Sequence, residues 1–323
     1  MLTDKSIRRV NYYINHCMEQ SILKVENLSH RYSVQWAIRD INFEITQNGV
    51  YGLLGSNGAG KSTTMNIICG VLKQTEGNVF IKGIDMRDNP VEAKRHIGFL
   101  PQKPPLHTDL TVEEYLDYSA RLRYIPHKEI PAAITEVVEK CGISHFRKRL
   151  IRNLSGGYQQ RVGIAQAIIH NPDFIILDEP TNGLDPNQIV EIRNLIKQIA
   201  QERTVILSTH ILPEVQATCE YIYMVEKGKM VFSGTVDEFD NYILPTTIRV
   251  TLLAHPTVEE LTMIPGLVAA QHLGEMDYRL QFADARNMVD EIIETCGIHN
   301  WRLSQIYMEK SSLDVVFAEL SKK

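Results

Sequence analysis

Hydrophobic and polar residues alternate with two different periods along most of this chain. Segments with period two, or with a short unbroken apolar run, predict strands at 22–32, 37–45, 48–55, 77–83, 96–102, 174–180 and 204–210. Segments with helical spacing lie among them, at 61–72, 186–203 and 211–220. Strands that alternate with helices predict an α/β domain with a mixed, mainly parallel sheet and an antiparallel β portion.

The character of the chain changes between residues 109 and 145. The segments 110–125 and 129–143 have helical spacing and polar faces. They predict a helical subdomain, at about 103–165, inserted into the α/β core. Residues 221–234, "YIYMVEKGKMVFSG", return to strand spacing and predict a hairpin.

The pattern restarts after about residue 241. Strand-like segments are expected at 246–254, 267–274, 277–283 and 301–309, with helical segments at 257–264, 285–298 and 312–320. The order β-α-β-β-α-β is that of a ferredoxin-like α+β fold. The predicted domains are therefore a nucleotide-binding domain at 21–240 and an accessory domain at 241–323.

Residues 1–20 show no clear period. They are interpreted as an N-terminal extension, and two explanations stay open. The extension is disordered, or translation begins at Met18, directly before the first strand-like pattern. Mass spectrometry of the protein terminus distinguishes the two.

Composition places the chain among ordinary globular proteins. Its 323 residues favour two domains, with 44% hydrophobic and 23% charged residues. The net charge of −5 gives no electrostatic case for nucleic-acid binding. The five cysteines are scattered and are interpreted as core thiols. There is no apolar run of about 18 residues and no signal-peptide pattern, so we expect a cytoplasmic protein that reaches a membrane only through a partner.

A glycine-rich loop follows the strand at 48–55 and precedes the helix at 61–72. It satisfies the pattern GxxxxGK[ST] in the context that indicates a phosphate-binding loop. Glycines let backbone N–H groups surround phosphates, and the helix N-terminus adds positive potential. Lys61 is expected to reach the β and γ phosphates, and Ser62 to bind Mg²⁺. The predicted ATP-binding residues here are Gly55, Ser56, Asn57, Gly58, Ala59, Gly60, Lys61, Ser62 and Thr63.

Two acidic residues end the apolar strand "FIILDE". Asp178 is placed to hold Mg²⁺, directly or through water. Glu179 follows it, where a carboxylate can polarise a water that attacks the γ phosphate. The predicted chemistry is therefore the hydrolysis of a nucleotide.

A second phosphate-binding surface is predicted at "NLSGGYQQR", residues 153–161. Ser155, Gly156 and Gly157 open a helix, and a hydroxyl with bare amides at a helix N-terminus binds anions. With this segment the sequence closely resembles the ATP-binding cassette (ABC) family, whose signature is LSGGxxxR. The resemblance covers residues 21–234 and is closest to ATPases of exporters with a separate permease, including multidrug and gliding-motility types.

The resemblance implies roles for further residues. Gln102 in "FLPQ" matches the glutamine that contacts Mg²⁺ and the attacking water, and His210 in "STH" matches the switch histidine at the γ phosphate. Asp185 in "GLDP" matches the residue at the dimer contact, and Tyr32 matches the aromatic that stacks on adenine. Ser56 stands where many relatives have proline, which we expect to leave the loop intact. Glu179, His210, Gln102 and Lys61 are thus the expected catalytic residues, and Ser62, Gln102 and Asp178 the expected metal ligands.

In the family, the phosphate loop of one subunit faces the signature of the other. The resemblance therefore implies an ATP- and Mg²⁺-dependent ATPase that forms a head-to-tail homodimer. It also implies an integral membrane permease as partner and a position at the inner face of the plasma membrane. A permease helix would enter a groove around residues 102–125.

Other functions fit the sequence less well. One alternative is a soluble ABC ATPase that acts on ribosomes or nucleic acid. The single cassette and the negative net charge disfavour it, and so does the absence of a long coiled coil between Lys61 and Asp178. A kinase or switch GTPase would lack the LSGG signature. Export is favoured over import, although importer ATPases share the same motifs. The 241–323 domain is read as a dimer clamp or packing element in preference to a substrate sensor. The transported substrate is not determined, because the permease selects it.

Overall fold

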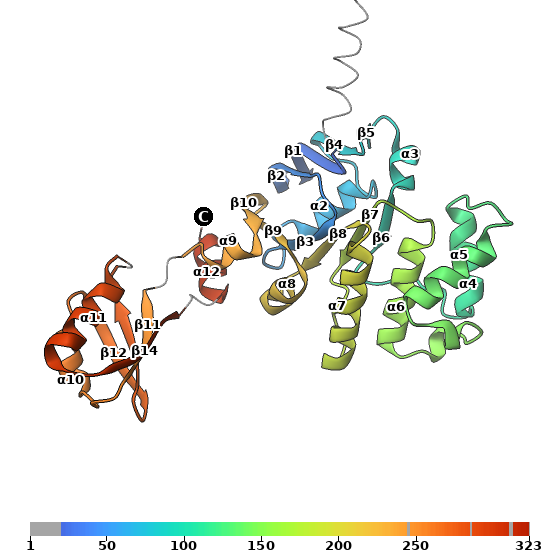
Figure 1. The fold of residues 1–323 in the computed structure, drawn as a ribbon. Helices are drawn as coiled ribbons and strands as arrows, with labels where there is room; N and C mark the ends of the chain where they lie inside the picture. Colours follow the sequence, from blue (N-terminus) through green and yellow to red (C-terminus); the bar gives the residue numbers. More distant parts are fainter. Residues whose placement is uncertain (1–20, 244–245, 285, 310–312, 323) are drawn as a thin grey trace, which may run out of the picture. The chain divides into compact units, whose positions relative to one another are not determined.

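The computed structural model describes residues 21–243, 246–284, 286–309 and 313–322 (Figure 1). The predicted extension at 1–20, with Cys17 and Met18, lies outside these residues. Contacts divide the chain into two compact units on either side of the bond between Gly234 and Thr235. Each unit has a hydrophobic core of its own.

The larger sheet of the first unit supports the phosphate loop. Its described strands are β3 (Gly49–Leu54), β6 (Ile97–Leu100), β7 (Phe174–Asp178), β8 (Thr204–Thr209), β9 (Tyr221–Glu226) and β10 (Lys229–Thr235). They lie in the order β10-β9-β3-β8-β7-β6, and the pairs β9–β3, β3–β8, β8–β7 and β7–β6 are parallel. Every residue of β3, β7 and β8 is buried. The mainly parallel sheet is confirmed, and it brings the carboxyl ends of its central strands to one edge.

A second sheet in this unit is antiparallel. It consists of β1 (Leu23–Tyr32), β2 (Gln35–Ile45), β4 (Glu76–Ile81) and β5 (Ile84–Asp85), in the order β2-β1-β4-β5 among the described strands. Its inward residues share one core with the larger sheet, where Leu23 and Phe43 join Tyr51 and Ile206. The antiparallel portion is therefore confirmed. The sequence pattern missed β5, which has only two residues.

Helices pack against the strands of the parallel sheet. Contacts with β3 come from α7 (Pro186–Ala200) and α8 (Leu212–Thr218), and contacts with β7 come from α2 (Lys61–Ile68). The short α3 (Pro90–Arg95), which the pattern did not predict, contacts β6.

A group of helices stands beside β6, at the edge of the parallel sheet (Figure 1). The group contains α4 (Val112–Leu122), α5 (Ile130–Lys140), the 3₁₀ turns η1 (Ser144–Phe146) and η2 (Ile151–Asn153), and α6 (Gly156–Ile168). The helices α4, α5 and α6 contact one another, and α6 contacts β6. Thr111 and Glu114 form a capping box that fixes the start of α4.

The second unit contains an antiparallel sheet with helices. Its described elements are α9 (Val236–Asp240), β11 (Thr247–Leu252), α10 (Val258–Leu261), β12 (Leu267–Gly274), β13 (Asp277–Phe282), α11 (Met288–His299), β14 (Leu303–Glu309) and α12 (Leu313–Leu320). The sheet order is β12-β13-β11-β14, with antiparallel neighbours. Alternate residues of β11 and β13 are buried in the core that includes Met288 and Ile292 of α11. The unit begins at Thr235, before the predicted restart at 241, because α9 contacts α12.

Two remaining expectations concern cysteines and membranes. Cys69, Cys141, Cys219 and Cys296 are free and buried, as predicted for core thiols. Across the described ranges, no helix has the length and apolar character needed to span a bilayer.

Candidate functional site

The phosphate loop connects the buried strand β3 to the first residue of α2. Gly60 caps this helix with a φ of 112°, and a Cβ there would meet Ile38 Cγ2 at 2.5 Å. A Cβ on Gly55 would lie 2.1 Å from the carbonyl oxygen of Val225. Glycine is therefore required at both ends of the loop, by conformation at Gly60 and by close backbone approach at Gly55.

The other predicted loop residues differ in exposure. Asn57 and Gly58 are exposed, Ala59 is buried, and Thr63 is half-buried. Ser62 is exposed at the start of α2. The tip of the loop and the N-terminus of the helix therefore face solvent, where a ligand can approach them.

Lys61 is buried inside this loop. Its Nζ donates to the carbonyl oxygens of Gly55 (2.8 Å) and Ser56 (3.0 Å), and only 6% of the residue is exposed. Burial lowers the pKa of Lys61, although the charges of Glu179, Asp178 and Glu226 oppose this shift. The structure thus holds an ammonium group among neutral carbonyls, an arrangement that an anion would stabilise.

Asp178 ends β7 and is buried. Its Oδ1 accepts a hydrogen bond from Ser208 Oγ on β8 (2.7 Å). Burial raises the pKa of Asp178, while hydrogen bonds from Ser208 and Ser62 oppose the rise. Ser62 and Asp178, predicted as metal ligands from different segments, are therefore neighbours in the folded chain.

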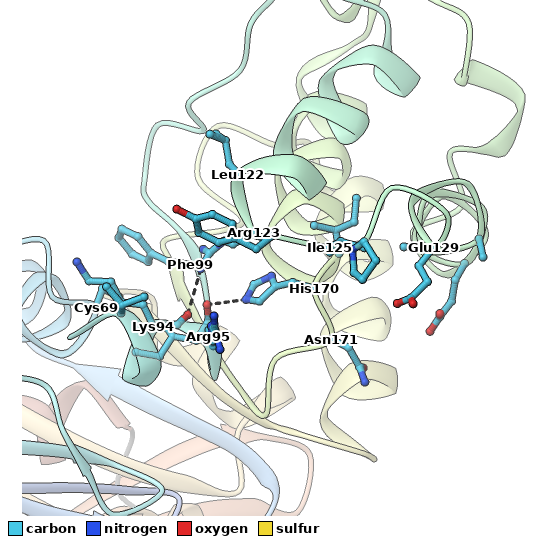
Figure 2. A pocket seen from close by; sticks show the side chains of 18 of the residues that line it. Cys69, Lys94, Arg95, Phe99, Leu122, Arg123, Ile125, Glu129, His170 and Asn171 are labelled. Atoms are coloured by element: carbon cyan, nitrogen blue, oxygen red, sulfur yellow. Dashed lines mark hydrogen bonds between the residues drawn. The ribbon is translucent and has the colours of Figure 1, made fainter. Parts of the chain in front are cut away.

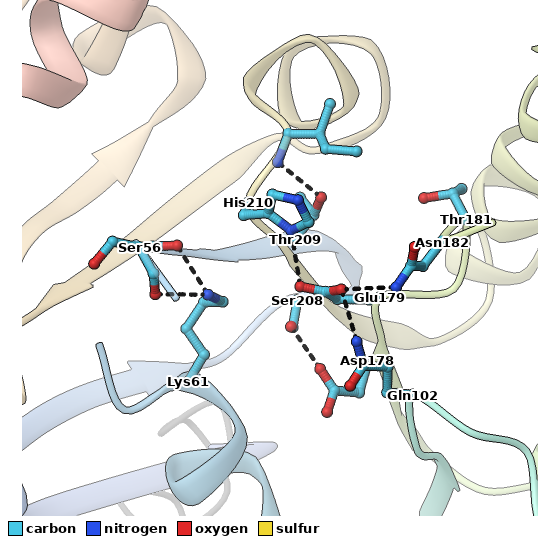
Figure 3. A network of polar contacts seen from close by, with 12 residues as sticks. Ser56, Lys61, Gln102, Asp178, Glu179, Thr181, Asn182, Ser208, Thr209 and His210 are labelled. Atoms are coloured by element: carbon cyan, nitrogen blue, oxygen red, sulfur yellow. Dashed lines mark hydrogen bonds and ion pairs between the residues drawn. The ribbon is translucent and has the colours of Figure 1, made fainter. Parts of the chain in front are cut away.

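Glu179 is the centre of a polar network (Figure 3). Its Oε2 accepts from Gln102 Nε2 (3.0 Å) and Asn182 Nδ2 (3.3 Å), and its Oε1 pairs with His210 Nδ1 (2.8 Å). The Glu179 backbone adopts a φ of 47°, and its N–H donates to the Ser208 carbonyl (3.0 Å). The structure therefore brings together three predicted residues that are far apart in the sequence.

The signature residues form a separate cluster between α6 and α7. Ser155 is the N-cap of α6, but its hydroxyl makes no capping hydrogen bond. A Cβ on Gly157 would lie 2.6 Å from Gln188 Cδ, whereas one on Gly156 would meet nothing within 4 Å. Asp185 caps α7 by accepting from the Gln188 N–H (3.0 Å). A cavity of about 250 Å³ lies here, lined in part by Gly157, Asp185 and Gln188.

Tyr32 lies at the end of β1 and is 54% exposed. Its ring packs edge-to-face on His30, with 4.7 Å between centroids. An exposed aromatic ring held at a strand end is available for stacking with a planar ligand.

Sequence reasoning missed several polar residues around the site. Asn182 and Ser208 support Glu179 and Asp178, as described above. Glu214 is buried and accepts from Thr181 Oγ1 (2.8 Å) and Thr209 Oγ1 (3.1 Å). Glu226 is buried at the end of β9, beside the phosphate loop. Glu226 could have been identified from the sequence, because it ends an apolar strand in the same way as Asp178 does.

A larger cavity, of about 1010 Å³, lies between the α/β core and the helical group. Figure 2 shows most of its lining residues, which come from the segment after α2, from α3, β6, the end of α4, the α4–α5 connection, α5 and the segment after α6. Arg123 NH1 donates to the Lys94 carbonyl (3.1 Å), and His170 Nε2 contacts the Ile97 carbonyl (3.0 Å). Burial lowers the pKa of His170 to about 4. The predicted interval 102–125 overlaps this cavity only at 122–125.

Among the residues that the structure describes, no group of three or more histidine, cysteine or acidic residues could hold a metal ion. Mg²⁺ is commonly bound by a few protein oxygens together with the phosphate oxygens of a nucleotide. Ser62, Asp178 and the side-chain amide of Gln102 offer oxygens of this kind. These residues therefore fit a nucleotide-bound metal better than an independent metal site.

Comparisons with known proteins identify similar chains. The family model described as "ABC transporter" matches residues 38–182. The bacitracin transport ATP-binding protein BcrA of Bacillus licheniformis is 39% identical over 65% of this chain and 69% of that protein. The linearmycin resistance ATP-binding protein LnrL of Bacillus subtilis is 28% identical over 93% of this chain and 98% of that protein. The dimeric ATP-binding cassette MJ0796, bound to ADP and Pi, has a TM-score of 0.60 and 28% identity over 66% of this chain and 98% of its own.

Proposed function

This chain belongs to the ATP-binding proteins of ABC transporters, and we propose that it powers export through a separate membrane permease. As a member of this family it is a transporter ATPase. The observation that supports hydrolysis at the predicted site is the Glu179 network, in which Gln102, His210 and Asn182 hold one carboxylate beside the Asp178 end of β7. A carboxylate held in one orientation suits a general base.

The residues of the loop fit the phosphates of ATP. The buried Lys61 ammonium and the N-terminus of α2 would bind the β and γ phosphates. Ser62, Asp178 and Gln102 would hold Mg²⁺, and Tyr32 would stack on adenine. When bound, ATP with Mg²⁺ supplies the phosphoanhydride that is hydrolysed. Glu179 would accept the proton of the attacking water, and His210 would orient Glu179 and contact the γ phosphate.

We propose that two copies pair head to tail. The hydroxyl of Ser155 does not cap α6, and a Cβ on Gly156 would have no neighbouring atom within 4 Å. These groups, with Gly157 and Asp185, would complete the ATP site of the partner copy. The dimeric state of MJ0796 supports such a pairing. Closure on ATP and opening after hydrolysis would drive the transport cycle.

The cavity between the core and the helical group is our candidate docking surface for the permease. Its lining is apolar at Phe99, Leu122 and Ile125 and basic at Lys94 and Arg123 (Figure 2). An amphipathic cytoplasmic segment of the permease would suit this mixture. The proposal places the protein in the cytoplasm, at the inner face of the plasma membrane.

Export and the domain roles are part of the same proposal. BcrA is named for bacitracin transport and LnrL for linearmycin resistance, which favours export by this chain. We assign nucleotide binding to residues 21–240, with the helical subdomain at about 103–165, and an accessory role to 241–323. The sheet order β12-β13-β11-β14 and the helix positions support a ferredoxin-like fold for the accessory domain.

The test is purification of tagged Glu179→Gln from gently solubilised membranes with ATP, followed by mass spectrometry. A photo-crosslinking residue at Ala133, which lines the cavity, should label a multi-span protein. A matched probe at the exposed Glu139 of the same helix should not. Recovery of ribosomal or DNA-bound proteins without a permease would contradict the transporter proposal.

A further inference from the structure

A tight turn after β9 contacts the phosphate loop. Lys227 and Gly228 connect β9 to β10, and both have positive φ, 48° and 78°, as in a two-residue hairpin turn. The Gly228 N–H donates to the Ala59 carbonyl in the loop (3.0 Å), and the Gly228 carbonyl accepts from the Arg39 N–H of β2 (2.7 Å). The turn is therefore hydrogen-bonded to the phosphate loop on one side and to the antiparallel sheet on the other.

The backbone packing around this turn leaves little space. A Cβ on Gly228 would lie 2.7 Å from the Ala37 carbonyl oxygen, and one on Gly55 would lie 2.1 Å from the Val225 carbonyl oxygen. The parallel pairing of β9 with β3 fixes this arrangement, since Leu54, just before the loop, pairs with Met224. The first residues of the loop therefore lie directly against the end of β9.

Glu226 joins the two segments by its side chain. The residue is 8% exposed, its Oε1 accepts from Ser56 Oγ (2.8 Å), and its Oε2 accepts from the Ser56 N–H (3.3 Å). A buried carboxylate is stabilised by hydrogen bonds from nearby donors. Both of these donors come from Ser56 in the phosphate loop, so the positions of Ser56 and Glu226 are linked.

We propose that Glu226 is a positioning residue for ATP binding, which holds the start of the phosphate loop in its binding conformation through Ser56. The proposal rests on the proposed function of that loop. Glu226 contacts no nucleotide in this scheme; it acts by reducing the conformational freedom that the loop would otherwise lose when ATP binds. A proline at position 56 would have neither a hydroxyl nor an N–H to donate to Glu226. The proposed role of Glu226 therefore depends on the serine at position 56.

The test is a double-mutant cycle on the purified full chain. Ser56→Ala removes the hydroxyl donor, and Glu226→Gln removes the charge and one acceptor oxygen. Each single change should raise the KM for ATP about 5- to 10-fold, in line with the loss of a charge-assisted hydrogen bond, with a smaller fall in kcat. The double variant should lose less ATP affinity than the product of the two single losses, because both changes act on the same pair of residues.

Direct binding of a fluorescent ATP analogue and circular dichroism accompany the kinetics. Glu139→Gln, a change at an exposed carboxylate of α5, is the matched control and should leave KM unchanged. Independent, multiplicative effects of the two substitutions would overturn the proposal. If Glu226→Gln does not fold, an unchanged KM in folded Ser56→Ala overturns it equally. If Lys61→Ala loses binding of the ATP analogue but Ser56→Ala binds it normally, only the role of Glu226 is refuted. If Lys61→Ala binds the analogue normally, the loop is not the ATP site.

Discussion

Replacing Glu179 by glutamine tests the proposed base with almost no change in side-chain shape. The Glu179 side chain is only 12% exposed, and its two oxygens serve three donors. Glutamine keeps one acceptor oxygen and turns an NH₂ group toward the remaining donors. The lost hydrogen bonds should cost about 1–3 kcal/mol of folding stability. The lost base should slow hydrolysis about 10²- to 10⁴-fold, which corresponds to roughly 3–5 kcal/mol in the barrier.

Phosphate release at saturating ATP measures the catalytic loss, and equilibrium binding measures the affinity. The kcat of Glu179→Gln should fall at least about 100-fold. Its affinity for ATP should stay close to that of the wild type, because the phosphate loop is unchanged. Light scattering should detect a dimer that accumulates with ATP. Glu139→Gln serves as the control for loss of a carboxylate. A kcat within tenfold of the wild type would mean that Glu179 is not the base.

Three further predictions address other parts of the chain. Lys61→Ala should weaken ATP binding about 10- to 100-fold, because the buried ammonium no longer meets the phosphates; unchanged affinity in a binding titration would exclude the loop as the ATP site. Tyr32→Ala should weaken ATP binding about fivefold or more through lost stacking, while Tyr32→Phe should bind as the wild type does; equal affinities of the alanine variant and the wild type would remove Tyr32 from the site. His170, whose pKa is lowered to about 4, should make the chain less stable in acid. The unfolded chain takes up this proton below its ordinary pKa of about 6.5, so stability falls as the pH drops from 6.5 toward 4, by about 2 kcal/mol at pH 5. Urea unfolding at pH 8 and pH 5 should show a smaller difference for His170→Gln, and an identical difference would contradict the assignment.

The phosphate loop could be predicted because its chemistry is contiguous in the sequence. Glycines, Lys61 and Ser62 lie within one short segment between a strand and a helix, so local geometry alone brings their donors together. The central strands were predictable for a similar reason, since short unbroken apolar runs such as Phe174–Leu177 are typical of strands buried on both faces of a sheet.

The Glu179 network could be predicted only in part. The resemblance to the ABC family supplied Gln102 and His210, and the parallel order of β6, β7 and β8 explains why both reach Glu179. Asn182 was not predicted as a partner, because its contact depends on the path of the chain after β7 and on the left-handed backbone of Glu179. The interval 102–125, where a permease helix is expected, meets the cavity only at 122–125, because nine of the nineteen lining residues come from α3, α5 and the residues after α6.

Residue type and short spacing are enough to identify the phosphate-binding residues, the buried strands and the family that the motifs resemble. Which distant side chains come into contact depends on how the strands pair in the folded chain. The contact of Glu226 with Ser56 spans 170 positions and exists because β9 pairs in parallel with β3 in one register. A shift of that register by one residue would turn Glu226 to the other face of the sheet, and no local pattern specifies the register between two strands so far apart.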